Sequence, residues 1–217
     1  MSADAVAAID APTGARSELY RLLAEALAFP ERAFHARVER GALRDEAADL
    51  LGRLPYRLPT AVDLDGLSEA GPYVDFQAEY IRLFDVGAVR PPCPLYGGEW
   101  GGSRKQTMEE VLRFYRYFGM KVSEQARELP DHVTIELEFL QVLVFEEGMA
   151  QAAGVDPAPL LRAERDFLER HPARWWPLLE RKLASQEPAR FYAALASLTG
   201  AFLGRELTYV RSRLEAA

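Results

Sequence analysis

His132 and Glu136 are the residues whose types and spacing most directly suggest chemistry. They lie four positions apart, so on a helix both side chains point from one face, and both types can bind metals. With Asp131 beside them, they could serve a helical metal-dependent enzyme. The other histidines, His35 and His171, have no comparable neighbours in sequence, and no Glu-x-x-His motif occurs. Asp131 capping a helix and a hydrogen-bonded histidine explain the same residues, so we expect no metal.

Two further segments offer weaker chemical signals. Cys93 is the only cysteine and lies among prolines without a nearby histidine, which favours a packed loop thiol over a nucleophile. A single cysteine also excludes an intrachain disulfide and indicates a reducing compartment. The glycine-rich run 97–102 follows no predicted strand and matches neither phosphate-loop nor dinucleotide spacing, so we expect no cofactor there.

Aromatic and acidic side chains gather in two irregular stretches, 86–106 and 120–132. The first contains Tyr96, Glu99 and Trp100 among prolines and glycines, and the second ends in Glu128, Pro130, Asp131 and His132. A carboxylate accepts hydrogen bonds from a guanidinium, and an aromatic ring offers apolar and cation–π contact. The two stretches are therefore suited to recognising an arginine-containing, partly apolar peptide.

Helices must position these stretches, because apolar residues recur at helical spacing through most of the chain. The segment from Val133 to Phe145 is the most apolar, and its length and internal Glu and Gln residues favour a central helix over a strand. We predict an all-α, single-domain bundle of eight to ten helices over residues 16–217, behind a flexible N-terminus at 1–15. Helices are expected at 16–29, 30–41, 43–54, 72–87, 107–118 and 133–145, and after 156, 172 and 188.

Composition narrows the class of protein. The chain has 217 residues, 49% of them hydrophobic and 27% charged, and a net charge of −7. Such a chain buries enough surface to fold without disulfides or metal, and its acidity disfavours nucleic acid as a partner. No run approaches the roughly 18 apolar residues of a membrane span, and residues 1–15 lack the features of a secretory signal. We expect a cytoplasmic protein.

Three stretches together resemble the TorD/DmsD/NarJ family. Residues 80–84 followed by Gly87 resemble its Tyr-x-x-Leu-Phe segment, and Pro94-Leu95-Tyr96 with Glu99 and Trp100 resembles its proline–tyrosine loop. Residues 128–140 are similar to its Glu-x-Pro-Asp-His motif and the Glu-Leu-Glu-Phe helix behind it. The order and spacing of these pieces make the resemblance specific.

The resemblance implies an all-helical, TorD-like chaperone without catalytic turnover. Such a chaperone binds the apo catalytic subunit of a molybdopterin enzyme, often through its twin-arginine signal peptide, assists cofactor insertion and delays export. By position, the resemblance places the recognition residues at Tyr80, Phe84, Pro94, Tyr96, Glu99, Trp100, Pro130, Asp131, His132 and Glu136.

One departure indicates a subgroup. Many members carry a Glu-Ser-type sequence after the loop tyrosine, whereas this chain has Gly97-Gly98 before Glu99-Trp100. With Arg104 and residues 113–115, this resembles the chaperones of type II dimethyl-sulfoxide-reductase-family enzymes. Those chaperones serve ethylbenzene dehydrogenase, dimethylsulfide dehydrogenase and the selenate and chlorate reductases.

We therefore hypothesise that both irregular stretches and the helix after His132 form one groove. Asp131, Glu99 and Glu136 would meet the signal's arginines, while Tyr96, Trp100 and Phe84 would meet its apolar stretch. Asp131 could instead act as the helix cap, and His132 could tune affinity through its charge near neutral pH. A general peptide-binding adaptor and the metal-dependent enzyme remain the alternatives.

Overall fold

The computed structural model describes residues 9–59, 62–85, 90–121 and 128–216, whose regular secondary structure is helical without any β-strand. The α-helices are α2 (Ala11–Ala26), α3 (Arg32–Glu39), α4 (Ala42–Arg53), α5 (Tyr73–Phe84), α6 (Arg104–Tyr117), α7 (Val133–Ala152), α8 (Ala158–Arg170), α9 (Pro172–Ala184) and α10 (Arg190–Glu215). Two short 3-10 turns, η1 (Asp65–Ser68) and η2 (Gly97–Glu99), complete the list. The predicted all-α fold is confirmed.

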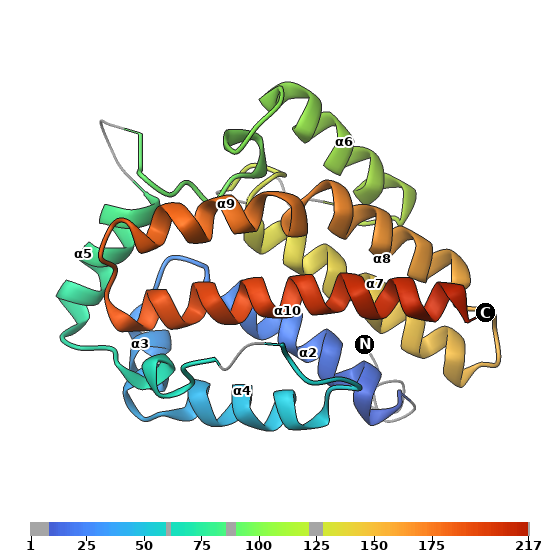
Figure 1. Cartoon of the computed structure of the whole chain (residues 1–217), viewed down its shortest axis with the longest axis horizontal. Helices are drawn as coiled ribbons and strands as arrows, with labels where there is room; N and C mark the ends of the chain where they lie inside the picture. The colour runs from blue at the N-terminus through green and yellow to red at the C-terminus, as the bar shows by residue number, and fades with distance from the viewer. Residues whose placement is uncertain (1–8, 60–61, 86–89, 122–127, 217) are drawn as a thin grey trace.

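The core lies where α2, α7 and α10 meet α8 and α9. In Figure 1, α10 runs the length of the molecule with α9 and α8 alongside it, while α6 stands at one edge. The helix α7 buries residues on most sides, among them Leu137, Phe139 and Leu140, as predicted for the central helix. None of the described helices combines the length and apolar character that crossing a membrane requires.

Some predicted helix boundaries are wrong. The helix α2 begins at Ala11, inside the stretch 1–15 that we predicted to be flexible, because the Asp10 carboxylate accepts the N–H of Thr13 at 2.7 Å and caps the helix. Residues 1–8 lie outside the described residues, as does Gly87, where we predicted that the helix containing α5 would end.

The helix α6 also begins earlier than predicted. Ser103 is its N-cap and accepts the N–H of Gln106, so Thr107 lies inside the helix and does not open a capping box with Glu110. The helix α7, by contrast, starts at the predicted residue and continues to Ala152, beyond the predicted apolar run.

A fully buried arginine joins four helices. Arg16 on α2 donates to Glu147 on α7 at 2.6 Å, to Glu164 on α8 at 2.8 Å and to Glu206 on α10 at 2.9 Å. The Tyr56 hydroxyl also donates to Glu206. Burial raises the pKa of the Glu164 carboxyl well above its ordinary value, while Arg16 and further hydrogen bonds lower that of Glu206 against the effect of burial. We call Arg16 and its three carboxyl partners the arginine cluster.

The arginine cluster makes a direct prediction for stability. Arg16→Met should lower the free energy of unfolding by about 3–5 kcal/mol, because it leaves the buried Glu164 and Glu206 without their cation, while Glu147 keeps Arg213 at 3.1 Å. Urea denaturation measures the change. The control is Arg21→Met on the same helix: the Arg21 side chain is 40% exposed, and its ion pairs should contribute less than about 1 kcal/mol. Equal losses in the two variants would contradict the role of the cluster.

Candidate functional site

Where the structure describes them, the two irregular stretches lie directly against each other; residues 86–89 and 122–127 lie outside the described residues. The N–H of Gly97 donates to the Asp131 carbonyl at 2.9 Å, and the N–H of Gly98 donates to the Asp131 side chain at 3.0 Å. The N–H of Val133 donates to the Leu95 carbonyl at 2.8 Å. The two stretches are therefore in contact, as the hypothesis of one groove requires, and we call residues 94–100 and 128–133 together the loop junction.

Tyr96 and His132 face each other at the centre of the loop junction. They form an isolated antiparallel bridge, and their rings meet edge to face with centroids 4.9 Å apart. The Tyr96 hydroxyl donates to Glu128, which adds a side-chain bond between the two stretches. Pro130 contributes through its carbonyl, which accepts the hydroxyl of Tyr115 from α6 at 2.9 Å.

His132 and Asp131 are buried, which changes the roles predicted for them. Nδ1 of His132 lies 2.8 Å from the Thr134 hydroxyl and accepts the N–H of Thr134, so His132 rather than Asp131 caps α7. Burial lowers the pKa of His132 to about 4, so the predicted change of its charge near neutral pH is wrong. Burial raises the pKa of Asp131, and its carboxylate binds the backbone of Gly98.

Glu136 lies behind the loop junction, with none of its surface exposed. It accepts the indole N–H of Trp175 from α9 at 3.1 Å, and burial raises its pKa well above its ordinary value. A methyl group at Gly97 would lie 2.9 Å from the Trp175 indole nitrogen and 3.1 Å from a Glu136 oxygen, so only glycine fits there. Sequence reasoning missed Trp175, whose only signal was its place in an apolar Trp-Trp pair.

Glu99 and Trp100 are partly accessible within the loop junction, as are Glu128 and Leu129. The Trp100 ring stacks on that of Trp175 with an interplanar angle of 8°, and its indole N–H donates to the Pro94 carbonyl at 2.8 Å. Glu99 pairs with Arg90 and, at 3.2 Å, with Arg104. Glu99, with a side chain that is 18% exposed, is the one carboxylate of the predicted arginine-binding set that is not buried, and it is already paired with two arginines of this chain.

Tyr80 and Phe84 lie outside the loop junction. Both belong to the buried face of α5, where the Tyr80 hydroxyl donates to the Leu27 carbonyl at 3.1 Å and the two rings meet at 5.3 Å. Phe84 is 5% exposed, so its predicted contact with a peptide has no surface to use. Next to α5, Cys93 donates its N–H to the Leu83 carbonyl, and burial raises the pKa of its thiol to about 11.

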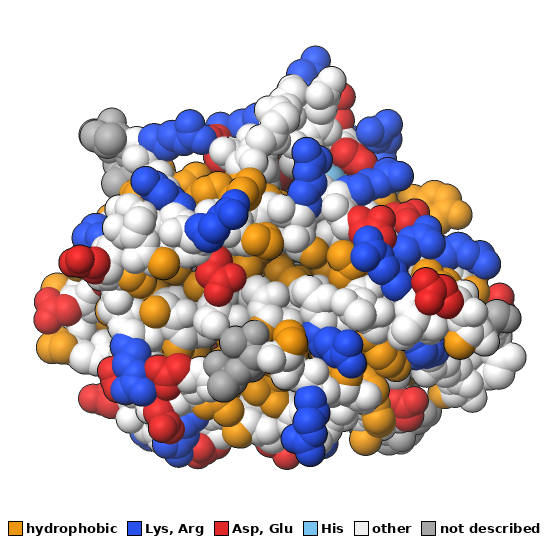
Figure 2. Space-filling view, viewed as in Figure 1, with side chains coloured by type: hydrophobic (Ala, Val, Ile, Leu, Met, Phe, Trp, Pro, Cys, Tyr) orange, Lys and Arg blue, Asp and Glu red, His pale blue; other side chains and the backbone are white. Residues whose placement is uncertain are grey.

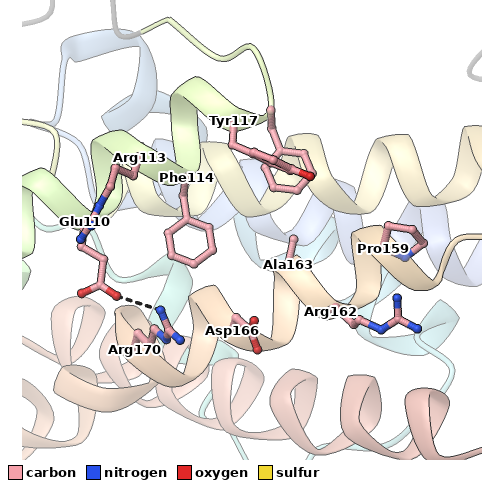
Figure 3. A pocket seen from close by; sticks show the side chains of 10 residues that line it. Glu110, Arg113, Phe114, Tyr117, Pro159, Arg162, Ala163, Asp166 and Arg170 are labelled. Carbon is pink, nitrogen blue, oxygen red and sulfur yellow. Dashed lines mark hydrogen bonds and ion pairs between the residues drawn. The ribbon is translucent and has the colours of Figure 1, made fainter.

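A cleft of about 270 Å³ opens beside Trp100. Its walls are mostly apolar, with two basic residues and one acidic residue, and it is lined by Arg90, Pro91, Pro92, Pro94, Glu99, Trp100 and Lys182. We call it the Trp100 cleft. A separate groove of about 430 Å³ runs between α6 and α8, where Phe114 points toward α8 and Arg170 pairs with Glu110 (Figure 3). Figure 2 shows Lys and Arg side chains gathered on this side of the molecule, around α6, α8 and α9.

The predicted metal-binding pair has other partners. Within the described residues, no group of three or more His, Cys, Asp or Glu side chains is placed to hold a metal ion. His132 is held by Thr134, and one oxygen of Glu136 accepts the indole N–H of Trp175.

Comparisons with known proteins agree on one family. Residues 56–181 match the family described as nitrate reductase delta subunit. The chain is 31% identical to the perchlorate reductase assembly chaperone protein of Dechloromonas aromatica, covering 89% of this chain and 88% of that one. It is 40% identical to the selenate reductase assembly chaperone protein of Thauera selenatis, over 64% and 69% of the two chains. A solved structure from Archaeoglobus fulgidus, described as a redox enzyme maturation protein, shares the fold with a TM-score of 0.53, at 20% identity, covering 87% of this chain and 93% of that one.

The buried carboxyl of Glu136 makes stability depend on pH. The pKa of Glu136 is raised above 4.5 in the folded chain, so the unfolded chain releases this proton at lower pH than the folded chain does. The free energy of unfolding that Glu136 contributes therefore falls as the pH rises above about 4.5. Glu136→Gln removes the effect while Trp175 keeps an acceptor. The free energy of unfolding of the Glu136→Gln variant, minus that of the unmodified chain, should therefore increase between about pH 4 and about pH 8. Urea denaturation across this range measures the trend, with the exposed Glu109→Gln as a control for charge. A flat difference for Glu136→Gln would contradict the assignment.

Proposed function

Because this chain belongs to the nitrate reductase delta subunit family, as the resemblance to the TorD/DmsD/NarJ chaperones predicted, we propose that it is an assembly chaperone and not an enzyme. Its client is the apo catalytic subunit of a molybdopterin enzyme, of the kind whose chaperones it resembles. It binds that subunit in the cytoplasm, assists cofactor insertion and delays export. The similarity to named assembly chaperones over most of the chain is the observation that carries this proposal.

The Trp100 cleft is the surface that we assign to the client. Trp100 is half-buried, and stacking on Trp175 and the bond to Pro94 hold its ring in place. A fixed aromatic ring beside proline rings loses little conformational entropy when an apolar side chain packs against it. Such a surface favours a segment of the client that is partly apolar.

The twin-arginine signal peptide is the client segment that we propose for this cleft. Asp131 and Glu136 are buried, so we assign them the role of holding the loop junction, and we leave Glu99 to meet an arginine. The Arg90 side chain is 66% exposed, whereas that of Glu99 is 18% exposed. An incoming arginine would therefore exchange with Arg90 and keep Glu99 paired throughout, which avoids leaving a carboxylate without a cation.

A truncation tests the contact surface. Trp100→Ala should raise the Kd for the client's signal peptide by at least about tenfold, because truncated aromatic anchors dominate the loss of affinity at interfaces. Isothermal titration with the signal peptide of the client subunit measures it. Tyr117→Ala is the matched control, since Tyr117 is an aromatic residue with 83% exposure on α6. An unchanged Kd for Trp100→Ala would remove the Trp100 cleft from the proposal.

The proposed exchange of arginines predicts that one variant binds the peptide more tightly, with a lower Kd. Arg90→Gln should lower the Kd for the same peptide roughly two- to fivefold, because Glu99 loses a competing cation. Glu99→Gln should raise the Kd, and replacing the peptide's arginines by glutamine should cancel both effects. A higher Kd for Arg90→Gln would show that Arg90 helps to bind the peptide and would contradict the exchange.

The general adaptor differs from this proposal in its partner. Purified from its own cells, the chain should carry an apo molybdoenzyme catalytic subunit as its main partner, identified by mass spectrometry. A broad set of unrelated proteins would favour the adaptor, and a stoichiometric metal in the purified chain would favour the enzyme.

A further inference from the structure

His171 is a buried histidine that the loop junction does not use. It lies between α8 and α9 with 1% of its surface exposed, and within the described residues neither ring nitrogen has a hydrogen-bond partner. The other two histidines are paired, His132 with Thr134 and His35 through Nε2 with the Gly71 carbonyl at 2.9 Å. A buried polar group without a partner costs free energy, so His171 calls for an explanation.

A small cavity adjoins His171 and carries positive charge. Its volume is about 140 Å³, and it is lined by Gly97, Trp100, Gly101, Thr107, Arg170, His171, Arg174, Trp175 and Leu178. Two arginines and no acidic residue stand among these side chains. Arg170 also pairs with Glu110 at 3.1 Å on the side of the α6–α8 groove (Figure 3). For Arg174, no ion pair forms within the part of the chain that the structure describes.

We propose that this cavity binds a single oxyanion, a phosphate or carboxylate group, held by Arg174, Arg170 and a ring N–H of His171. Arginine offers several N–H donors in a planar fork that suits both groups, so Arg170 can serve Glu110 and the anion together. Thr107 also lines the cavity, but its hydroxyl already donates to the Ser103 carbonyl at 3.3 Å. Pockets that enclose whole ligands measure roughly 300–1,000 Å³, so this smaller cavity takes one charged group rather than an entire cofactor.

The site is separate from the Trp100 cleft although both touch Trp100. The cleft is open and lies on the side of Arg90 and Lys182, whereas the cavity lies on the side of α8 and the start of α9. The inference does not depend on the proposed client, and a failure of either leaves the other standing.

Nuclear magnetic resonance of carbon-labelled histidine rings tests the proposal on the whole chain, because three histidines give three resolvable sets of signals. Inorganic phosphate should shift the His171 signals in a saturable way and raise the pKa of His171, which burial lowers to about 4. Glu110 from α6, Arg170 from α8 and Arg174 from α9 are the charged groups that act on this ring, and only the added anion changes between samples. His132, buried with a similar pKa but already hydrogen-bonded, should not move.

Two variants and a second probe complete the design. Arg174→Gln should weaken phosphate binding about tenfold, as expected for the loss of a charge-assisted hydrogen bond, while Arg181→Gln on the same helix should have little effect. N-acetylaspartate amide stands for an acidic side chain of another protein. Saturation by phosphate alone assigns the site to a phosphate-bearing small molecule, and saturation by the aspartate derivative assigns it to a protein carboxylate.

Three results would overturn the proposal. The first is that neither probe moves the His171 signals, which leaves water as the partner of the ring. The second is an equal shift with chloride at matched ionic strength, and the third is an equal loss of binding in the Arg181 and Arg174 variants. Either of the last two would reduce the effect to the general positive charge of this side of the molecule.

Discussion

The arginine cluster is the interaction on which the rest of the structure depends. Arginine keeps its proton under all ordinary conditions, so a fully buried Arg16 obliges the fold to supply acceptors around it. Those acceptors come from α7, α8 and α10, and their directions fix how these helices are rotated about α2. Hydrophobic packing alone tolerates small rotations, whereas three carboxyl groups converging on one guanidinium do not. The cluster therefore sets the framework that carries the loop junction roughly 20 Å away along α7.

The polar residues of the loop junction have two roles: the buried ones hold the two stretches together, and the accessible ones are available to contact a partner. Asp131 binds the backbone of the facing stretch, and His132 binds the backbone at the start of α7. Glu136 accepts the indole N–H of Trp175. Burial keeps His132 neutral and favours the protonated form of the two acids, which makes them suited to short-range hydrogen bonds rather than to attracting a distant cation. Glu99 and Trp100 are part of the accessible surface and rest on the buried residues, and Glu128 and Leu129 complete that surface.

Much of the fold could be predicted from sequence because its signals are local. Apolar spacing located the helices, including the central one from Val133, and the resemblance brought the two irregular stretches together. The errors have a common physical origin. In the sequence, Arg16 looks like an ordinary exposed helical residue, because its partners Glu147, Glu164 and Glu206 lie more than 130 positions away and no local pattern links them to it. In the same way, no local pattern distinguishes an acid that faces solvent from Asp131, whose burial depends on the approach of Gly98 from another part of the chain.

Cys93 gives this chain a practical advantage for spectroscopy. Its sulfur is enclosed beside α5, and thiolate formation there is suppressed by burial, so reagents that alkylate thiolates meet an inert group. A cysteine introduced on an exposed turn of α6 would then be the sole reactive handle, without any need to delete the native one. A fluorophore or spin label placed there would report on the movement of α6 against α8 in an otherwise unaltered chain.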